Sequence, residues 1–129
     1  MSLQNSKPPQ FQLNNLLSYY QKKQYDNAEK LATSITKKYP NHEYAWKILA
    51  AVQEQTGRVV EAKKANLKAL NISPKDPEIH LCLGNNLSQL GDFEGAESSY
   101  KKAISLKPDY VQAYFNLGFI LKKMQRFDE

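Results

Sequence analysis

Residues 74–108 read PKDPEIHLCLGNNLSQLGDFEGAESSYKKAISLKP and both begin and end on a proline. A third proline, Pro40, lies 34 residues before Pro74, and Pro108 lies 34 residues after it. Other residue types recur at the same interval, among them a leucine followed by a small residue: Leu49-Ala50, Leu83-Gly84 and Leu117-Gly118. A fixed period of this length indicates an array of repeated structural units.

Each repeat has the apolar spacing of two helices. In residues 43–55 apolar side chains recur at intervals of three and four, and Gly57 follows as a stop signal. Residues 59–72 show the same spacing, and Pro74 ends them because proline disfavours a helical conformation in the residue before it. The pattern predicts a helical hairpin for each repeat and seven helices in all. Their expected bounds are 10–22, 26–38, 43–55, 60–72, 77–89, 94–106 and 111–124.

With these residues in view, the chain resembles the tetratricopeptide repeat (TPR) family, whose repeat has an aromatic residue, a Leu-Gly pair, a later alanine and aromatic, and a closing proline. The segment YFNLG at 114–118 matches this pattern, as does Leu83-Gly84 followed by Ala96, Tyr100 and Pro108. The resemblance implies an all-α fold, a TPR-type superhelix (solenoid) of about three and a half 34-residue repeats.

The repeats divide the chain into a short start and one TPR domain. We expect a flexible N-terminus at residues 1–8, whose first three residues are compatible with a vector origin, and a TPR domain at residues 9–129. The expected repeats are about 9–42, 43–76, 77–110 and a truncated 111–129. Because the last repeat stops after its first helix, we expect the chain to be a fragment of a longer TPR-containing protein. That helix would leave Tyr114, Leu117 and Leu121 exposed, which favours self-association into an oligomer.

Composition excludes several classes of protein. No apolar run approaches the roughly 18 residues of a membrane-spanning helix, and the polar start has no secretory signal. The single cysteine, Cys82, cannot form an internal disulfide, so a cytoplasmic location is expected. The net charge of +5 comes almost entirely from lysines. Nucleic acid is an unlikely partner because Arg58 and Arg126 are far apart. The alternative of nucleic-acid binding rests on lysines of the second helices: Lys63, Lys64, Lys68, Lys101 and Lys102.

No arrangement of residues predicts an enzyme. The two histidines, His42 and His80, fall in different repeats, and His80 and Cys82 lie two apart on a helix, so their side chains point in different directions. No glycine-rich phosphate loop or zinc-type spacing is present. We therefore expect no catalytic residue, no cofactor and no metal. Since His80 stands where other repeats carry a buried aromatic, we expect it to be a packed, hydrogen-bonded histidine.

The face of each first helix opposite its packed side is the candidate binding surface. Trp46, Leu49 and Ala50 fall within about 100° on one side of their helix and must face its partner. In the TPR family the opposite side lines a concave groove. The resemblance therefore implies these groove residues: Tyr44, Lys47, Ala51, Glu54, Leu81, Asn85, Ser88, Gln112, Phe115, Asn116, Phe119 and Lys122, with Leu13, Leu17 and Tyr20 in the first repeat.

This lining mixes apolar area with amide side chains that can bond a peptide backbone, so it predicts a protein-protein interaction scaffold that binds a peptide segment of a partner. Two alternatives stay open. Leu81, Phe115 and Phe119 could pack between neighbouring first helices, and Asn85 and Asn116 could be ordinary solvated groove polarity.

Two subclasses of the family bear on the ligand. One grips acidic peptide C-termini with a clamp of lysines and asparagines. Lys47 matches the clamp, but Ala51, Cys82, Gln112 and Asn116 depart from it. Another subclass carries asparagines along the groove ahead of glycosyltransferases, sulfotransferases or oxygenases, and here Asn116 matches. The alternative function is therefore a substrate-recruiting or regulatory arm of a larger enzyme whose catalytic domain is not in this chain.

Overall fold

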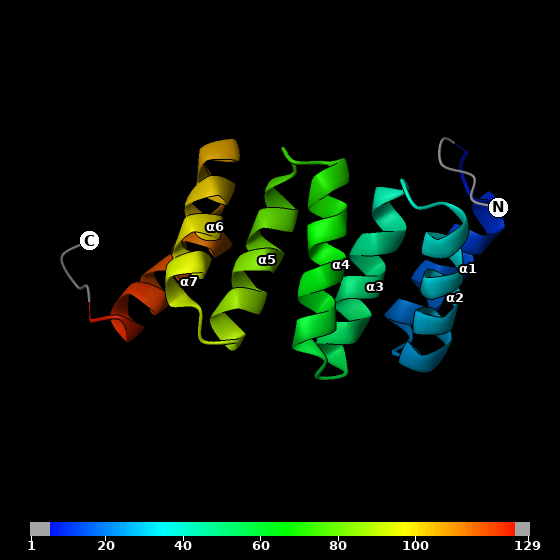
Figure 1. Ribbon diagram of the computed structural model, residues 1–129, viewed down its shortest axis with the longest axis horizontal. Helices are drawn as coiled ribbons and strands as arrows, with labels where there is room; N and C mark the ends of the chain where they lie inside the picture. Colours follow the sequence, from blue (N-terminus) through cyan, green and yellow to red (C-terminus); the bar gives the residue numbers. More distant parts are fainter. Residues whose placement is uncertain (1–5, 126–129) are drawn as a thin grey trace. The chain divides into compact units, whose positions relative to one another are not determined.

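The computed structural model describes residues 6–125, which form seven α-helices and no strand (Figure 1). The helices are α1 (Gln10–Gln21), α2 (Tyr25–Lys38), α3 (Glu43–Gln55), α4 (Val59–Ile72), α5 (Pro77–Gln89), α6 (Phe93–Leu106) and α7 (Val111–Lys123). Each bound lies within one residue of the bound predicted from the sequence, so the all-α prediction is confirmed. Helices α1–α4 form a first unit that ends at Ile72, and α5–α7 form a second unit that begins at Ser73.

The first unit consists of two helical hairpins, α1 with α2 and α3 with α4, and α3 also packs on α2 and α1. Its core alternates small and large side chains. Leu16, Ile35 and Leu49 are buried among alanines such as Ala28 and Ala45. Alanine lets helix backbones approach closely, so the pairs bury their apolar faces with few large residues.

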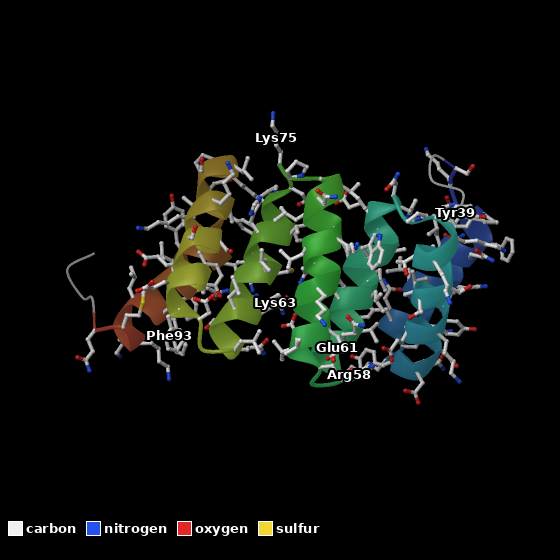
Figure 2. The ribbon with its side chains drawn as sticks, viewed as in Figure 1. Tyr39, Arg58, Glu61, Lys63, Lys75 and Phe93 are labelled. Atoms are coloured by element: carbon white, nitrogen blue, oxygen red, sulfur yellow. The ribbon has the colours of Figure 1, made fainter. Side chains whose placement is uncertain are left out.

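An ion pair ties the two hairpins of the first unit together. The Arg58 guanidinium donates to Glu29 Oε1 at 2.5 Å and to Thr56 Oγ1 at 3.1–3.2 Å. Figure 2 shows Arg58 and Glu61 at the end of α4 where that helix begins. The hydrogen bond from Arg58 holds the pKa of Glu29 below its ordinary value of 4.5, although partial burial of the carboxyl acts in the opposite direction.

This ion pair gives the first unit an acid-sensitive contribution to stability. Because the folded pKa of Glu29 is lowered, the contribution is fully present above pH 4.5 and is lost as the pH falls through the folded value. We expect Glu29→Gln to lower the urea midpoint at pH 7, and the difference from wild type to shrink towards pH 3. A difference between the two chains that stays constant with pH would contradict the assignment.

Every first helix ends on the same left-handed residue. The four residues with positive φ stand 34 positions apart: Lys23 (60°), Gly57 (82°), Gly91 (84°) and Gln125 (59°). In the first three turns the following amide donates back to a carbonyl five residues earlier, as Arg58 does to Gln53 at 2.8 Å. This is the bonding of a Schellman turn, which favours glycine because a side chain is strained at positive φ.

The strain at Lys23 makes a stabilising substitution available. Lys23→Gly relieves the left-handed conformation at some cost in chain entropy, and we expect a net gain of about 0.5–1 kcal/mol in the free energy of unfolding. The matched control is Lys22→Gly, since Lys22 has a φ of −85° and gains nothing from glycine. Urea titrations of the two variants should therefore shift in opposite directions from wild type.

The second unit is the α5–α6 hairpin with α7 packed on it. Its core contains Leu81, Tyr100 and Ile120 together with small residues, and Phe93, at the start of α6 in Figure 2, packs against its edge. The Tyr100 ring lies directly on Gly84: a β-carbon at that position would sit 2.6 Å from a ring carbon. Glycine is therefore required where α5 and α6 meet.

Two expectations about the ends of the chain need comment. Tyr114 is 50% exposed, as predicted for α7, but Leu121 is only 8% exposed, so its predicted exposure is wrong. Leu121 follows Leu117 by one helical turn, and Leu117 packs on the core of the second unit. Of the predicted flexible start, residues 1–5 lie outside the described residues, as do residues 126–129 of the last repeat, whereas Pro8 is buried.

Candidate functional site

The first helices of three repeats share one hydrogen bond at their start. It runs from Trp46 Nε1 to the Pro40 carbonyl (2.8 Å), between His80 Nε2 and the Pro74 carbonyl (2.8 Å), and from the Tyr114 hydroxyl to the Pro108 carbonyl (3.0 Å). A carbonyl only accepts, so His80 carries its proton on Nε2. His80 is 8% exposed, which confirms the prediction of a packed histidine. The shared bond holds each of these helices to the loop before it.

In the first unit the candidate face lies on α1 and α3, which are in contact. None of its predicted residues is buried; they are Leu13, Leu17, Tyr20, Tyr44, Lys47, Ala51 and Glu54. Lys47 lies 3.8 Å from Glu43 on the same helix. Burial raises the pKa of Tyr44 above 10.0, against a smaller opposing effect of Lys47, so its hydroxyl stays neutral at pH 7. This face offers aromatic and aliphatic area beside one positive and one negative group.

In the second unit Asn85 joins three helices. Its Oδ1 accepts a hydrogen bond from the Tyr100 hydroxyl of α6 at 2.6 Å and another from Asn116 Nδ2 of α7 at 2.9 Å. Tyr100 is only 2% exposed, so its hydroxyl depends on this acceptor. The sequence analysis missed this structural role. The available signal was a tyrosine predicted to be buried, which must find a partner for its hydroxyl.

The same bonds orient the two amides. Asn85 Nδ2 and Asn116 Oδ1 make no hydrogen bond to any other residue within 6–125. Both side chains are partly exposed. One unused donor and one unused acceptor therefore lie on linked side chains, which matches the carbonyl and N–H groups of a peptide backbone.

Exposed aromatic rings lie on α7 next to this amide pair. Phe115 is 76% and Phe119 54% exposed, and the Lys123 ammonium lies 5.5 Å from the centre of the Phe119 ring. Gln112 and Lys122 are also exposed, and Ser88 on α5 is partly exposed. The structure thus brings together amide, aromatic and basic groups on α5 and α7.

Leu81 does not belong to this surface. It is 5% exposed and lies in the core cluster with Ala113 and Ile120 of α7. Of the two roles open from the sequence, packing between neighbouring first helices is the one observed, because α7 covers this side of α5. We therefore remove Leu81 from the set of contact residues.

Two further searches cover the described part of the chain. Between residues 6 and 125 no three His, Cys, Asp or Glu side chains are grouped so that they could hold one metal ion. None of the helices α1–α7 is long and apolar enough to cross a membrane.

Two family models match the sequence. One, described as tetratricopeptide repeat, matches residues 19–84, and the other, described as TPR repeat, matches residues 84–125. The chain belongs to the tetratricopeptide repeat family. The two matches meet at Gly84, so TPR similarity extends over both units.

Curated relatives of this TPR chain include glycosyltransferases. It is 35% identical over 104 residues to the protein O-mannosyl-transferase TMTC1 of Mus musculus, covering 75% of this chain and 11% of the relative. It is 29% identical over 103 residues to the probable UDP-N-acetylglucosamine–peptide N-acetylglucosaminyltransferase SPINDLY of Hordeum vulgare, covering 74% of this chain and 11% of the relative. The chain therefore spans about a tenth of the length of these relatives.

Solved TPR structures share the fold. The first TPR of Spaghetti (RPAP3), bound to the HSP90 peptide SRMEEVD, superposes with a TM-score of 0.86 at 16% identity. The match covers 89% of this chain and 91% of that one. At this identity the likeness shows the fold.

Proposed function

We propose that this TPR chain is a protein-interaction scaffold that binds an extended peptide segment of a partner protein. The proposed contact surface in the second unit, called the amide–aromatic face, consists of Asn85, Asn116, Phe115 and Phe119. The observation that carries the proposal is the oriented amide pair beside two exposed rings.

The amide pair supplies affinity that does not depend on the peptide's side chains. Asn85 Nδ2 can donate to a backbone carbonyl, and Asn116 Oδ1 can accept from a backbone N–H. Both amides are held in place by the bonds among Asn85, Tyr100 and Asn116, so binding costs little further ordering. The amide pair therefore favours an extended segment whose backbone groups are not already paired.

The aromatic and basic groups supply selectivity. Phe115 and Phe119 offer apolar area that a peptide side chain can cover, and Lys122 and Lys123 lie in the last turn of α7. We expect preferred peptides to combine an apolar anchor with a nearby acidic residue. In the first unit, Tyr44, Lys47, Ala51, Glu54 and the α1 residues offer a second surface of the same kind.

The comparisons support peptide binding as a general role. A solved TPR structure of the same fold holds an HSP90 peptide that ends in EEVD. In this chain Ala51 and Cys82 stand where that type of carboxylate clamp uses asparagines, and Gln112 and Asn116 replace its two basic residues. We therefore propose an internal peptide segment as the ligand in place of a free acidic C-terminus.

Selection from a phage library of random dodecapeptides tests the amide–aromatic face. We expect enriched peptides to bind the double variant Asn116→Ala/Phe119→Ala at least 10-fold more weakly than wild type. Both side chains are partly or largely exposed, so helicity and melting should change little. The matched control is Ser98→Ala/Lys102→Ala, which alters exposed residues of α6 and should bind as wild type does.

Two results would reject this face as the binding site. One is a library that yields no enriched peptide. The other is a set of enriched peptides whose affinity is the same for the double variant and for wild type.

A second candidate function is a substrate-recruiting or regulatory arm of a larger glycosyltransferase. It is favoured by the two transferase relatives, of whose length the chain matches 11% each. In that case binding would belong to these helices and catalysis to another domain. The complete coding sequence distinguishes the two, because a transferase domain on the same polypeptide supports the arm and further repeats alone support the scaffold.

The cytoplasm is our proposed location, for which the single cysteine is the support. Fractionation of cells that express the intact protein tests it.

A further inference from the structure

One side of α7 repeats the side of α5 that is covered by α6. His80 and Tyr114 occupy the same repeat position, as do Gly84 and Gly118. In α5 both residues are buried, whereas in α7 Tyr114 is 50% exposed and Gly118 is exposed. Val111, on the same side, is 77% exposed. We call Val111, Tyr114 and Gly118 the α7 docking face.

The two glycines show what is needed to cover this face. At Gly84 the Tyr100 ring would lie 2.6 Å from an added β-carbon, so glycine is required by the packing. At Gly118 nothing lies within 4 Å of an added β-carbon. A glycine in the middle of a helix weakens that helix relative to alanine, and among the described residues Gly118 has no packing that compensates. The pattern fits a ring that settles on Gly118 when a partner is present.

The docking face is already ordered without that partner. The Tyr114 hydroxyl donates to the Pro108 carbonyl at 3.0 Å, the same bond that Trp46 and His80 make in their own repeats. The side chain that borders Gly118 therefore does not have to be fixed on binding, which lowers the entropic cost of docking.

We propose that the α7 docking face binds an amphipathic helix with the chemistry of α6. In α6 the covering residues are Ala96, Tyr100 and Ala103, which are 0%, 2% and 0% exposed. The occupant is therefore a helix with an aromatic residue that lies on Gly118, an alanine or similar small residue four positions before it, and another three positions after it. The inference extends the α5–α6 interface to the equivalent side of α7.

Charge sets the direction of the docked helix. The three-residue turn between α5 and α6 makes them antiparallel, and α6 carries the acidic Glu94 in its first turn. An antiparallel helix on α7 would place such an acidic first turn beside Lys122 and Lys123, which lie in the last turn of α7. The occupant is expected to be acidic at its N-terminal end.

This helix and the peptide of the amide–aromatic face occupy different sides of α7. At about 100° per residue, Gly118 and Asn116 lie about 160° apart around the helix axis. The two proposals can therefore fail independently of each other.

The probe is a synthetic peptide with the sequence of residues 91–107, GDFEGAESSYKKAISLK, blocked at both ends. In ¹⁵N-labelled protein we expect it to shift the amide resonance of Gly118, which can be assigned because the chain has only five glycines. Affinities come from fluorescence anisotropy of the labelled peptide. Gly118→Ala should weaken binding at least 10-fold without loss of helicity, because alanine strengthens the helix but its methyl group displaces the ring. A peptide with alanine in place of its tyrosine should lose binding to a similar extent.

The control protein is Asn116→Ala, which should bind the helical peptide as wild type does. The proposal is overturned if the peptide does not bind, or if neither Gly118→Ala nor removal of the peptide's tyrosine weakens it. It is also overturned if sedimentation shows that a second copy of the chain covers this face, seen as a dimer that Gly118→Ala abolishes and the peptide cannot displace. That last result would support the self-association predicted from the sequence.

Discussion

Gly84→Ala is expected to lower the free energy of unfolding of the second unit by about 2 kcal/mol, the net of about 3 kcal/mol for overpacking and a gain of about 1 kcal/mol in helix propensity. The added methyl group would meet three ring atoms of Tyr100 at 2.6–3.1 Å. The ring cannot easily move away, because Tyr100 is 2% exposed and its hydroxyl is bonded to Asn85 at 2.6 Å.

Far-UV circular dichroism during urea titration measures this effect, with Gly118→Ala as the matched control. That substitution makes the same chemical change at the same repeat position, but no atom lies within 4 Å of the new methyl group. It should raise the free energy of unfolding by up to about 1 kcal/mol. Equal shifts of the two variants, in either direction, would show that the Tyr100–Gly84 contact does not limit packing.

Asn85→Ala is expected to cost about 2 kcal/mol, because it leaves the hydroxyl of the buried Tyr100 without an acceptor. The amide of Asn116 loses the same acceptor but is partly exposed and can turn to water. If this reason is right, adding Tyr100→Phe to Asn85→Ala should cost nothing further, since the unpaired hydroxyl is then absent.

A double-mutant cycle on Asn85 and Tyr100 measures this coupling by urea unfolding. Additive losses from Asn85→Ala and Tyr100→Phe would count against the shared hydrogen bond. The cycle also explains why binding should be tested at Asn116 and Phe119: loss of binding in Asn85→Ala would not separate contact with the peptide from damage to the fold.

The helices could be predicted from the sequence because their limits are set by local chemistry repeated every 34 residues. Prolines end the second helices, and the turn at Gly57 and Gly91 ends the first helices. Such signals act over a few residues, so they do not depend on which helix packs where. The same turn at Lys23 escaped notice, because a lysine gives no sign of the left-handed conformation that its neighbours impose.

The candidate site was harder to predict, because exposure depends on neighbouring helices. Leu81 and Phe115 occupy the same repeat position and are both apolar, yet one is 5% and the other 76% exposed. The difference comes from α7, which covers α5 and has no such cover itself within residues 6–125. Asn85 likewise needed knowledge of which donors approach it, and these come from residues 15 and 31 positions further on.

The indole of Trp46 has a practical consequence for measuring the stability of this chain. It is the only tryptophan in the sequence, it is anchored to the Pro40 carbonyl, and it lies in the first unit. Its emission will follow the melting of α1–α4 alone, while the dichroic signal sums over all helices. Recording both signals in one titration would therefore reveal whether the N-terminal and C-terminal halves denature in a single cooperative step or in succession.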